Sequence, residues 1–101
     1  MAMKVDLTER AKQDIANIFE YYQFRAGLKV AKKEVSKILK RIKILSNFPF
    51  VGQKEENEKT KDFDCRYLVQ GNYKILYEVE EKQINVLTIF NTSQHPNKMS
   101  I

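Results

Sequence analysis

The chain has 101 residues, of which 43% are apolar and 31% are charged, and its formal net charge is +5. This length supports one hydrophobic core, so we exclude a multidomain enzyme with a separate cofactor domain and expect a single domain over residues 1–101. The sequence contains no run of 18 apolar residues and no charged start ahead of an apolar segment. We therefore expect neither a membrane span nor a secretory signal.

The cysteine content indicates whether the protein's compartment is oxidising or reducing. Cys65 is the single cysteine, so it cannot form an internal disulfide. A domain that is not crosslinked and carries a free thiol suits a reducing environment, and we expect the protein in the cytoplasm.

The positive charge comes from one segment of the chain. Residues 25–43 hold eight basic residues against one acid, Glu34, whereas residues 1–24 and 44–101 each have one more acid than base. A segment of net charge +7 attracts acidic proteins or phosphate backbones. The alternative is a solvated helix face with no binding role.

The first half of the chain predicts a strand followed by two helices. Residues 4–7 alternate as in a strand, Thr8 is a suitable helix N-cap, and Gly27 breaks the helical pattern. The apolar positions are Ala11, Ile15, Ile18, Tyr22 and Ala26 before that break and Leu28, Ala31, Val35, Ile38, Ile42 and Leu45 after it. These spacings are typical of amphipathic helices, and the tight break predicts an antiparallel helical hairpin.

The second half predicts a small sheet. Pro49 and Gly52 end the second helix, and residues 53–62 are polar enough to form a surface loop. Three runs rich in β-branched and aromatic residues follow, the first two joined by a turn at Gly71–Asn72. The predicted fold is α+β: an N-terminal strand and an antiparallel helical hairpin packed on a small antiparallel β-sheet, with the first strand at the sheet's edge.

The predicted strands carry tyrosines on one face of the sheet and apolar residues on both faces. The alternation predicts Tyr67, Tyr73 and Tyr77 as core residues rather than as rings that stack on bases, with an inert Cys65 on their face. Apolar residues also occupy the opposite face. Either a partner chain or the protein's own tail is expected to cover that face.

The order of these elements and several short motifs together resemble the RelE/ParE superfamily of bacterial type II toxins, over nearly the whole chain. The motifs are Ala11-x-x-Asp14-x-x-x-Ile18-x-x-Tyr21-Tyr22, Phe48-Pro49-x-x-Gly52, Arg66-Tyr67-Leu68, Asn72-Tyr73-Lys74-Ile75-Leu76-Tyr77, and Ile84-Asn85-Val86-Leu87-Thr88-Ile89-Phe90 leading to Gln94-x-Pro96. The tyrosine pair, the Phe-Pro turn and the Tyr77 strand are more similar to the ParE branch.

The resemblance implies a toxin that a cognate antitoxin holds inactive, with growth inhibition and plasmid stabilisation as the associated roles. Members divide between inhibitors of DNA gyrase and ribosome-dependent mRNA endonucleases, and the shared scaffold does not separate the two. No cofactor is implied. The sequence shows no histidine or cysteine pairs at ligand spacing and no glycine-rich phosphate loop, so we expect no metal site.

RNA cleavage through the 2′-hydroxyl needs a base, an acid and a group that stabilises the pentavalent phosphate. Arg66 matches the arginine that family nucleases carry on this strand and is the first candidate for the phosphate; the alternative is an ion pair with Asp64 or a loop glutamate. His95, the only histidine, is the candidate acid or base, or else an exposed tail residue.

The candidate site also includes four lysines, and the chain departs from the family pattern at two positions. Candidate contacts to RNA or to another target are Lys54, Lys59, Lys61 and Lys98. Related toxins commonly carry an arginine, and often a histidine or acid, where this chain has Asn91 and Ser93. Because neither of these titrates near neutrality, the resemblance to the nucleases is weakest here.

Three functions are therefore open. The first is a ParE-like toxin that binds a macromolecular target such as DNA gyrase without chemistry of its own. The second is an endonuclease that cleaves mRNA on the ribosome, and the third is a non-toxic module that only binds its antitoxin. All three predict an antitoxin with an acidic or amphipathic segment.

Overall fold

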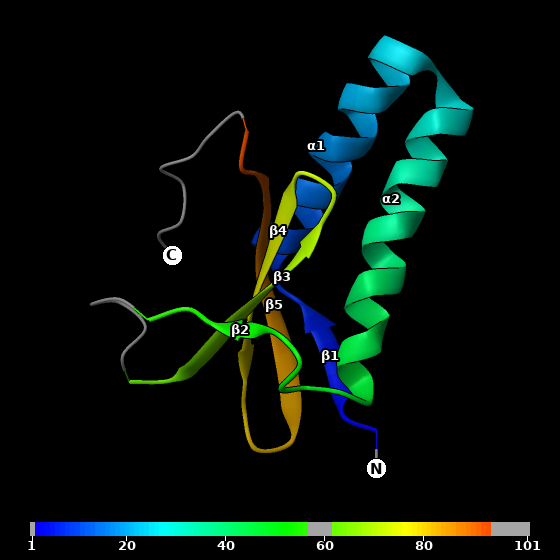
Figure 1. Ribbon diagram of the computed structural model, residues 1–101. Coiled ribbons are helices and arrows are strands. Elements are labelled where there is room, and N and C mark those ends of the chain that lie inside the picture. The colour runs from blue at the N-terminus through cyan, green and yellow to red at the C-terminus, as the bar shows by residue number, and fades with distance from the viewer. Residues whose placement is uncertain (1, 57–61, 94–101) are drawn as a thin grey trace.

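A five-stranded sheet and a helical hairpin make up the computed structural model, which describes residues 2–56 and 62–93 (Figure 1). The elements are β1 (Lys4–Leu7), α1 (Glu9–Ala26), α2 (Leu28–Lys43), a 3₁₀ turn (Ile44–Ser46), β2 (Gln53–Lys54), β3 (Asp64–Gln70), β4 (Tyr73–Val79) and β5 (Gln83–Asn91). The predicted strand, helical hairpin and three-stranded meander are confirmed. None of the helices in the described part of the chain is long and apolar enough to span a membrane.

The sheet is mixed rather than antiparallel. Its strand order is β1-β5-β4-β3-β2, and β1 runs parallel to β5 with Lys4 opposite Gln83 and Leu7 opposite Val86. The remaining pairs are antiparallel. The antiparallel meander and the position of the first strand at an edge are both as predicted, whereas the parallel direction of the β1–β5 pairing was not predicted. No tight turn joins β1 to its neighbour, so the local residue pattern carries no signal for the direction of this pairing.

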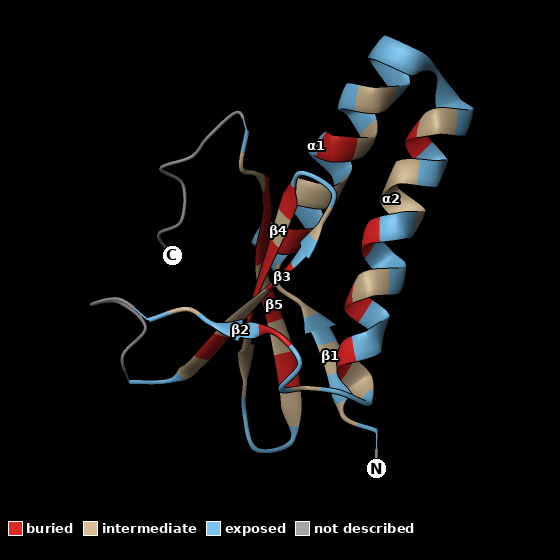
Figure 2. Ribbon diagram, in the orientation of Figure 1, coloured by how far each residue is buried: buried red, intermediate tan, exposed pale blue. Residues whose placement is uncertain are grey.

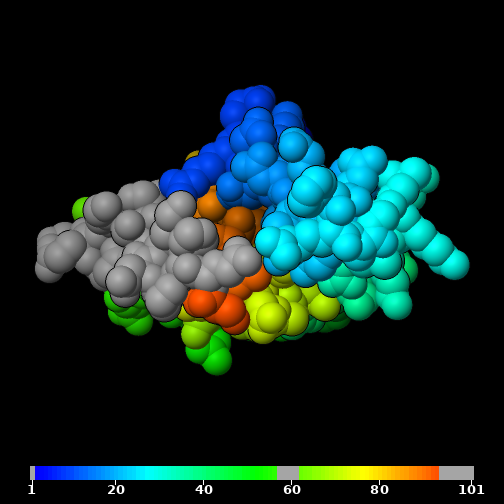
Figure 3. Space-filling model, turned by 90° about the horizontal axis from the view of Figure 1, so that it is seen from above, coloured from blue at the N-terminus to red at the C-terminus, as the bar shows by residue number. Residues whose placement is uncertain are grey.

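Two capping residues set the limits of the helices. The Thr8 hydroxyl accepts a hydrogen bond from the Ala11 amide at 3.1 Å and so caps α1. Gly27 has a φ of +96°, which is readily available only to glycine, and it both ends α1 and precedes α2. Both predicted boundaries are confirmed. Seen from above, the turn between the helices (cyan) projects at one end of the molecule (Figure 3).

The core lies between the helical hairpin and one face of the sheet (Figure 2). Its buried residues are Ala11, Ile18, Ile38, Ile42, Leu45, Leu68, Tyr73, Ile75, Tyr77, Ile84, Val86 and Ile89. Most of the predicted apolar positions point inward, but Ala26 is exposed and Leu28 remains 48% exposed. Leu39, which lies beside the predicted stripe of α2, is 41% exposed. The apolar stripe of α2 is therefore wider than the surface that the sheet covers.

The register of the β3–β4 hairpin separates residues that were expected on one face. The turn at Gly71–Asn72 places Cys65 opposite Glu78 and Tyr67 opposite Leu76, on the face away from Tyr73 and Tyr77. The prediction of a common face is wrong because a two-residue turn fixes the pairing, and a single-residue shift exchanges the faces.

The core prediction holds for Tyr73 and Tyr77 but not for Tyr67, which is only partly buried. Its hydroxyl donates to the Gln53 amide oxygen at 2.6 Å, and its ring lies 3.8 Å from the Lys74 ammonium. Gln53–Lys54 forms strand β2, so the expected surface loop over residues 53–62 is wrong at its start. The contact with Tyr67 and the pairing with β3 stabilise this short strand.

Residues on the second face of the sheet are also buried. Cys65, Leu76 and Phe90 are exposed by 1%, 1% and 9%. Burial raises the pKa of the Cys65 thiol from 9.0 to about 11, and nearby carboxylates act in the same direction. An inert cysteine is consistent with this environment. The tail proposed to cover this face runs over residues 92–101, and residues 94–101 lie outside the described residues.

Candidate functional site

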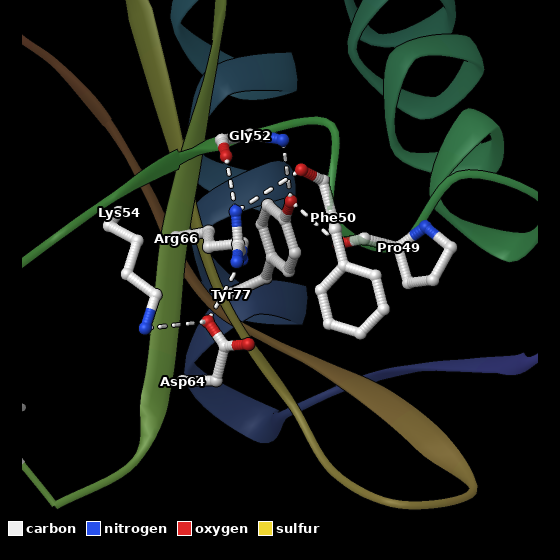
Figure 4. A network of polar contacts seen from close by, with 7 residues as sticks. All are labelled: Pro49, Phe50, Gly52, Lys54, Asp64, Arg66 and Tyr77. Atoms are coloured by element: carbon white, nitrogen blue, oxygen red, sulfur yellow. Dashed lines mark hydrogen bonds and ion pairs between the residues drawn. The ribbon is translucent and has the colours of Figure 1, made fainter.

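Arg66 lies at the centre of a network of polar contacts between β3 and the Phe-Pro turn (Figure 4). Its Nε donates to the Asp64 carboxylate at 2.9 Å. Its Nη1 donates to the carbonyl oxygens of Phe50 at 3.1 Å and Gly52 at 3.0 Å. The side chain is 17% exposed, and the Phe50 ring lies 5.1 Å from its guanidinium carbon. The ion pair with Asp64 that the sequence left open is therefore present.

Tyr77 holds the other side of the same turn. Its hydroxyl accepts the Gly52 amide at 2.9 Å and donates to the Pro49 carbonyl at 2.9 Å. The residue is fully buried, and burial raises the pKa of its phenol. A Cβ at Gly52 would lie 2.6 Å from this hydroxyl and 2.7 Å from the Tyr67 carbonyl oxygen. Only glycine fits here, and the turn is fixed from both sides.

Of the other candidate site residues, the structure describes one, Lys54. Lys54 lies on β2 with its ammonium 3.9 Å from the Asp64 carboxylate, next to Arg66. The remaining candidates, His95, Lys59, Lys61 and Lys98, lie outside the described residues. The structure therefore brings together Arg66 and Lys54, on a carboxylate that they share.

Asp14, for which the sequence predicted no role, joins α1 to the sheet. Its Oδ2 accepts hydrogen bonds from the Thr88 hydroxyl at 2.6 Å and the Ile89 amide at 3.0 Å. β1 pairs with β5 only as far as Val86, so the carboxylate takes up a strand-edge donor that β1 does not reach. An acid on the apolar stripe, three residues after Ala11, was the signal that could have identified it.

Asp14 also lines a hollow of about 250 Å³ between α1 and β5. Tyr73 forms another part of its wall, and its pKa is raised, chiefly by burial and next by the Tyr22 hydroxyl. In the part of the chain that the structure describes, no three carboxylate, cysteine or histidine side chains are grouped as metal ligands would be.

A second surface lies on the outer side of the helical hairpin. A groove of about 320 Å³ has Phe19, Val35 and Leu39 as its apolar residues. Its polar residues are Lys32, Ser36, Lys40 and Lys43. We call these seven residues the basic groove. Within residues 2–56 and 62–93, none of its three lysines forms an ion pair. Lysines of the helix on which the positive charge was expected thus surround an apolar floor.

Comparison with known proteins places this geometry in context. The profile of a family described as the ParE toxin of the type II toxin-antitoxin system parDE matches residues 5–96. No curated protein sequence matches the chain.

Several solved structures share the fold. A chain of the chromosomal ParDE toxin-antitoxin system of P. aeruginosa superposes with a TM-score of 0.76 at 24% identity, covering 89% of this chain and 96% of that one. The RelBE2 toxin-antitoxin complex of Mycobacterium tuberculosis gives 0.68 at 16%, covering 90% and 92%. The archaeal RelE-RelB complex of Pyrococcus horikoshii gives 0.66 at 19%, covering 90% and 96%.

Proposed function

Because the chain belongs to the ParE toxin family of type II toxin-antitoxin systems, we propose that it inhibits growth by binding a macromolecular target without cleaving a bond. DNA gyrase is the first candidate for that target, and the cytoplasm is the site of action. A cognate antitoxin neutralises the protein by docking on the basic groove.

The bonding of Arg66 is the observation that carries the first part of this proposal. To stabilise a pentavalent phosphate, a guanidinium must present its N–H groups to the phosphate oxygens. Here Nε and Nη1 already donate to a carboxylate and two backbone carbonyls. Turning them to a phosphate would take these donors away from the Asp64 carboxylate and from both backbone carbonyls. Arg66 is thus better suited to holding the Phe-Pro turn than to catalysis.

The charge and shape of the basic groove support the antitoxin as a partner. Its lysines surround an apolar floor, which complements an amphipathic segment whose polar side is acidic. The solved relatives from M. tuberculosis and P. horikoshii are toxin-antitoxin complexes. By analogy, we expect the antitoxin of this chain to be encoded beside it.

Two assays with the purified protein test the mode of action. In one, DNA gyrase supercoils a relaxed plasmid with increasing amounts of the protein; in the other, programmed ribosomes carry a labelled message. We expect supercoiling to be inhibited and the message to stay intact. Adding an RNase inhibitor should change neither result.

The endonuclease is the alternative that these assays separate. Cleavage of the ribosome-bound message together with undisturbed supercoiling would contradict our proposal. If neither activity appears but the neighbouring gene product still binds, the protein is an antitoxin-binding module without toxicity.

A further inference from the structure

The end of the helical hairpin that carries the turn at Gly27 extends beyond the sheet (Figure 1, Figure 3). The Gly27 amide donates to the carbonyl oxygens of Tyr22 and Gln23, each at 3.1 Å. The Gly27 carbonyl accepts from the Ala31 amide, also at 3.1 Å. The first two bonds end α1 and the third begins α2, so the turn has a fixed shape. We call residues 21–33 the hairpin tip.

The hairpin tip exposes large apolar side chains. Phe24 is 91% exposed, the highest value among the large apolar residues in the described part of the chain, and Leu28 is 48% exposed. Tyr21 is 37% exposed, and its ring lies 4.8 Å from the guanidinium carbon of Arg25. Phe24 therefore takes no part in the core. The tip leaves an apolar surface in water, which is typical of a site that contacts a partner or a membrane.

The same segment carries positive charge alone. It contains no acid, and its basic residues are Arg25, Lys29, Lys32 and Lys33. All of them are exposed, and among residues 2–56 and 62–93 none of them forms an ion pair. Lys32 is shared with the basic groove. The charge of the tip is thus not neutralised by the rest of the described chain, and it attracts a surface of negative charge.

Size separates a membrane surface from a groove of nucleic acid as the partner. Two packed helices with their side chains are about 20 Å across. The major groove of DNA is about 12 Å wide and admits a single helix, so the hairpin tip would reach only the phosphates. An exposed phenylalanine gains nothing there. A bilayer has anionic headgroups with acyl chains directly below them and sets no limit of width, so both the cations and the apolar side chains find a counterpart.

We propose that the hairpin tip binds the surface of a membrane that contains anionic lipids, without spanning it. Phe24 and Leu28 enter the boundary between headgroups and acyl chains. Tyr21, about 4.5 Å from Phe24 along α1, lies at the level of the headgroups. Arg25, Lys29 and Lys33 bind the lipid phosphates. This inference goes beyond the proposed function, because neither gyrase nor the antitoxin takes part in it.

A tryptophan reporter tests this inference in the full chain. The protein has no tryptophan, so Phe24→Trp places a single fluorophore at the tip. The probes are vesicles of phosphatidylglycerol and phosphatidylcholine in equal parts, with vesicles of phosphatidylcholine alone as the reference. We expect the anionic vesicles alone to shift the emission to the blue, and brominated acyl chains in them to quench it. Phe63→Trp, at a residue 46% exposed just before β3, is the matched reporter and should keep its emission.

Sedimentation with the same vesicles measures what each group contributes. Phe24→Ser should lower the partition coefficient about tenfold, and Lys29→Gln about fivefold. Lys82→Gln removes the same charge from the exposed turn between β4 and β5 and should change the partition coefficient less than twofold. Because all three side chains are exposed, the unfolding temperatures should match that of the wild type. This comparison separates a loss of binding from a loss of fold.

Each other result overturns the inference. If neither sedimentation nor a shift in emission is seen, the hairpin tip does not bind membranes. Equal binding to anionic and neutral vesicles contradicts attraction by charge, and an unchanged partition coefficient for Phe24→Ser contradicts insertion. If a duplex DNA fragment binds and Phe24→Ser weakens that binding, the tip contacts nucleic acid instead. The gyrase assay contains no lipid, so its outcome is independent of all of these.

Discussion

Cations on the sheet and cations on α2 have different surroundings. On the sheet, Lys54 and Arg66 share the Asp64 carboxylate, and Lys74 lies 3.8 Å from Glu55. On α2, one ion pair is present among the described residues, between Lys37 and Glu34 at 3.2 Å. The positive charge that is available to a partner is therefore on the helix.

This difference matters because both regions carry residues that are commonly assigned to binding. A carboxylate within an ion pair's distance screens a lysine or arginine and holds its position, whereas an unpaired lysine keeps its field and its mobility. We infer that the sheet cations act as scaffold and that the basic groove acts in recognition. The following changes are ordered by the size of their expected effect on stability.

Gly52→Ala should give the largest loss, because it attacks the scaffold directly. The new Cβ would lie 2.6 Å from the Tyr77 hydroxyl and 2.7 Å from a backbone oxygen, so the Phe-Pro turn must move. We expect the free energy of unfolding to fall by about 3 kcal/mol in chemical denaturation. Gly71→Ala is the control: its φ is +61° with no atom within 4 Å, so only the backbone preference is lost, about 1 kcal/mol. A smaller loss at Gly52 than at Gly71 would contradict this account.

Arg66→Gln should lower the free energy of unfolding by about 2 kcal/mol. The amide retains one donor but loses the charge-assisted bond to Asp64 and one of the two carbonyl contacts. Urea denaturation measures this change. If instead stability were unchanged and growth inhibition abolished, Arg66 would be a catalytic residue and not part of the scaffold.

Raising the pH should destabilise the protein through Cys65. The folded-state pKa of about 11 lies above the ordinary value of 9.0, so the native state favours the neutral thiol. Its stabilising contribution is present below pH 9 and is lost as the pH rises through 11. We expect about 2 kcal/mol of loss over this interval in the wild type. Cys65→Ala should show a correspondingly flatter profile, and identical profiles would show that another group is responsible.

Lys40→Gln should have the smallest effect on stability. Lys40 is exposed on α2 and lies one turn from both Lys37 and Lys43. Removing its charge relieves like-charge repulsion, so the free energy of unfolding should stay equal or rise by up to about 0.5 kcal/mol. A loss above 1 kcal/mol in thermal denaturation would mean that this lysine belongs to the scaffold.

Local sequence signals predicted the helices and strands well. They predicted poorly how the strands pair and which face of the sheet a residue occupies. Thr8 and Gly27 set the helix limits through their own backbone and side-chain chemistry, and the periodicity of α2 gave its inner face. The parallel pairing of β1 with β5 depends on residues far apart in the chain, which no short pattern encodes. The face of Cys65 depends on the register at Gly71–Asn72, where a shift of one residue reverses the result.

The same distinction applies to the candidate site. The sequence singled out Arg66 and offered Asp64 as its partner, because the two stand two residues apart on one strand. It gave no indication that the guanidinium also binds the Phe50 and Gly52 carbonyls, since these come from a turn 16 and 14 residues earlier, respectively. The basic groove was likewise visible only as charge, because its floor also includes Phe19 from the other helix.

Calorimetric titration of the antitoxin tests the division between scaffold and recognition surface most directly. The titrant is the neighbouring gene product, and the two double variants have equal net charge: Lys32→Glu/Lys40→Glu in the basic groove and Lys54→Glu/Lys82→Glu on the sheet side. We predict that the first raises the dissociation constant about a hundredfold and the second less than threefold. Equal losses would show that only the overall charge matters, and a larger loss from the sheet variant would contradict the account.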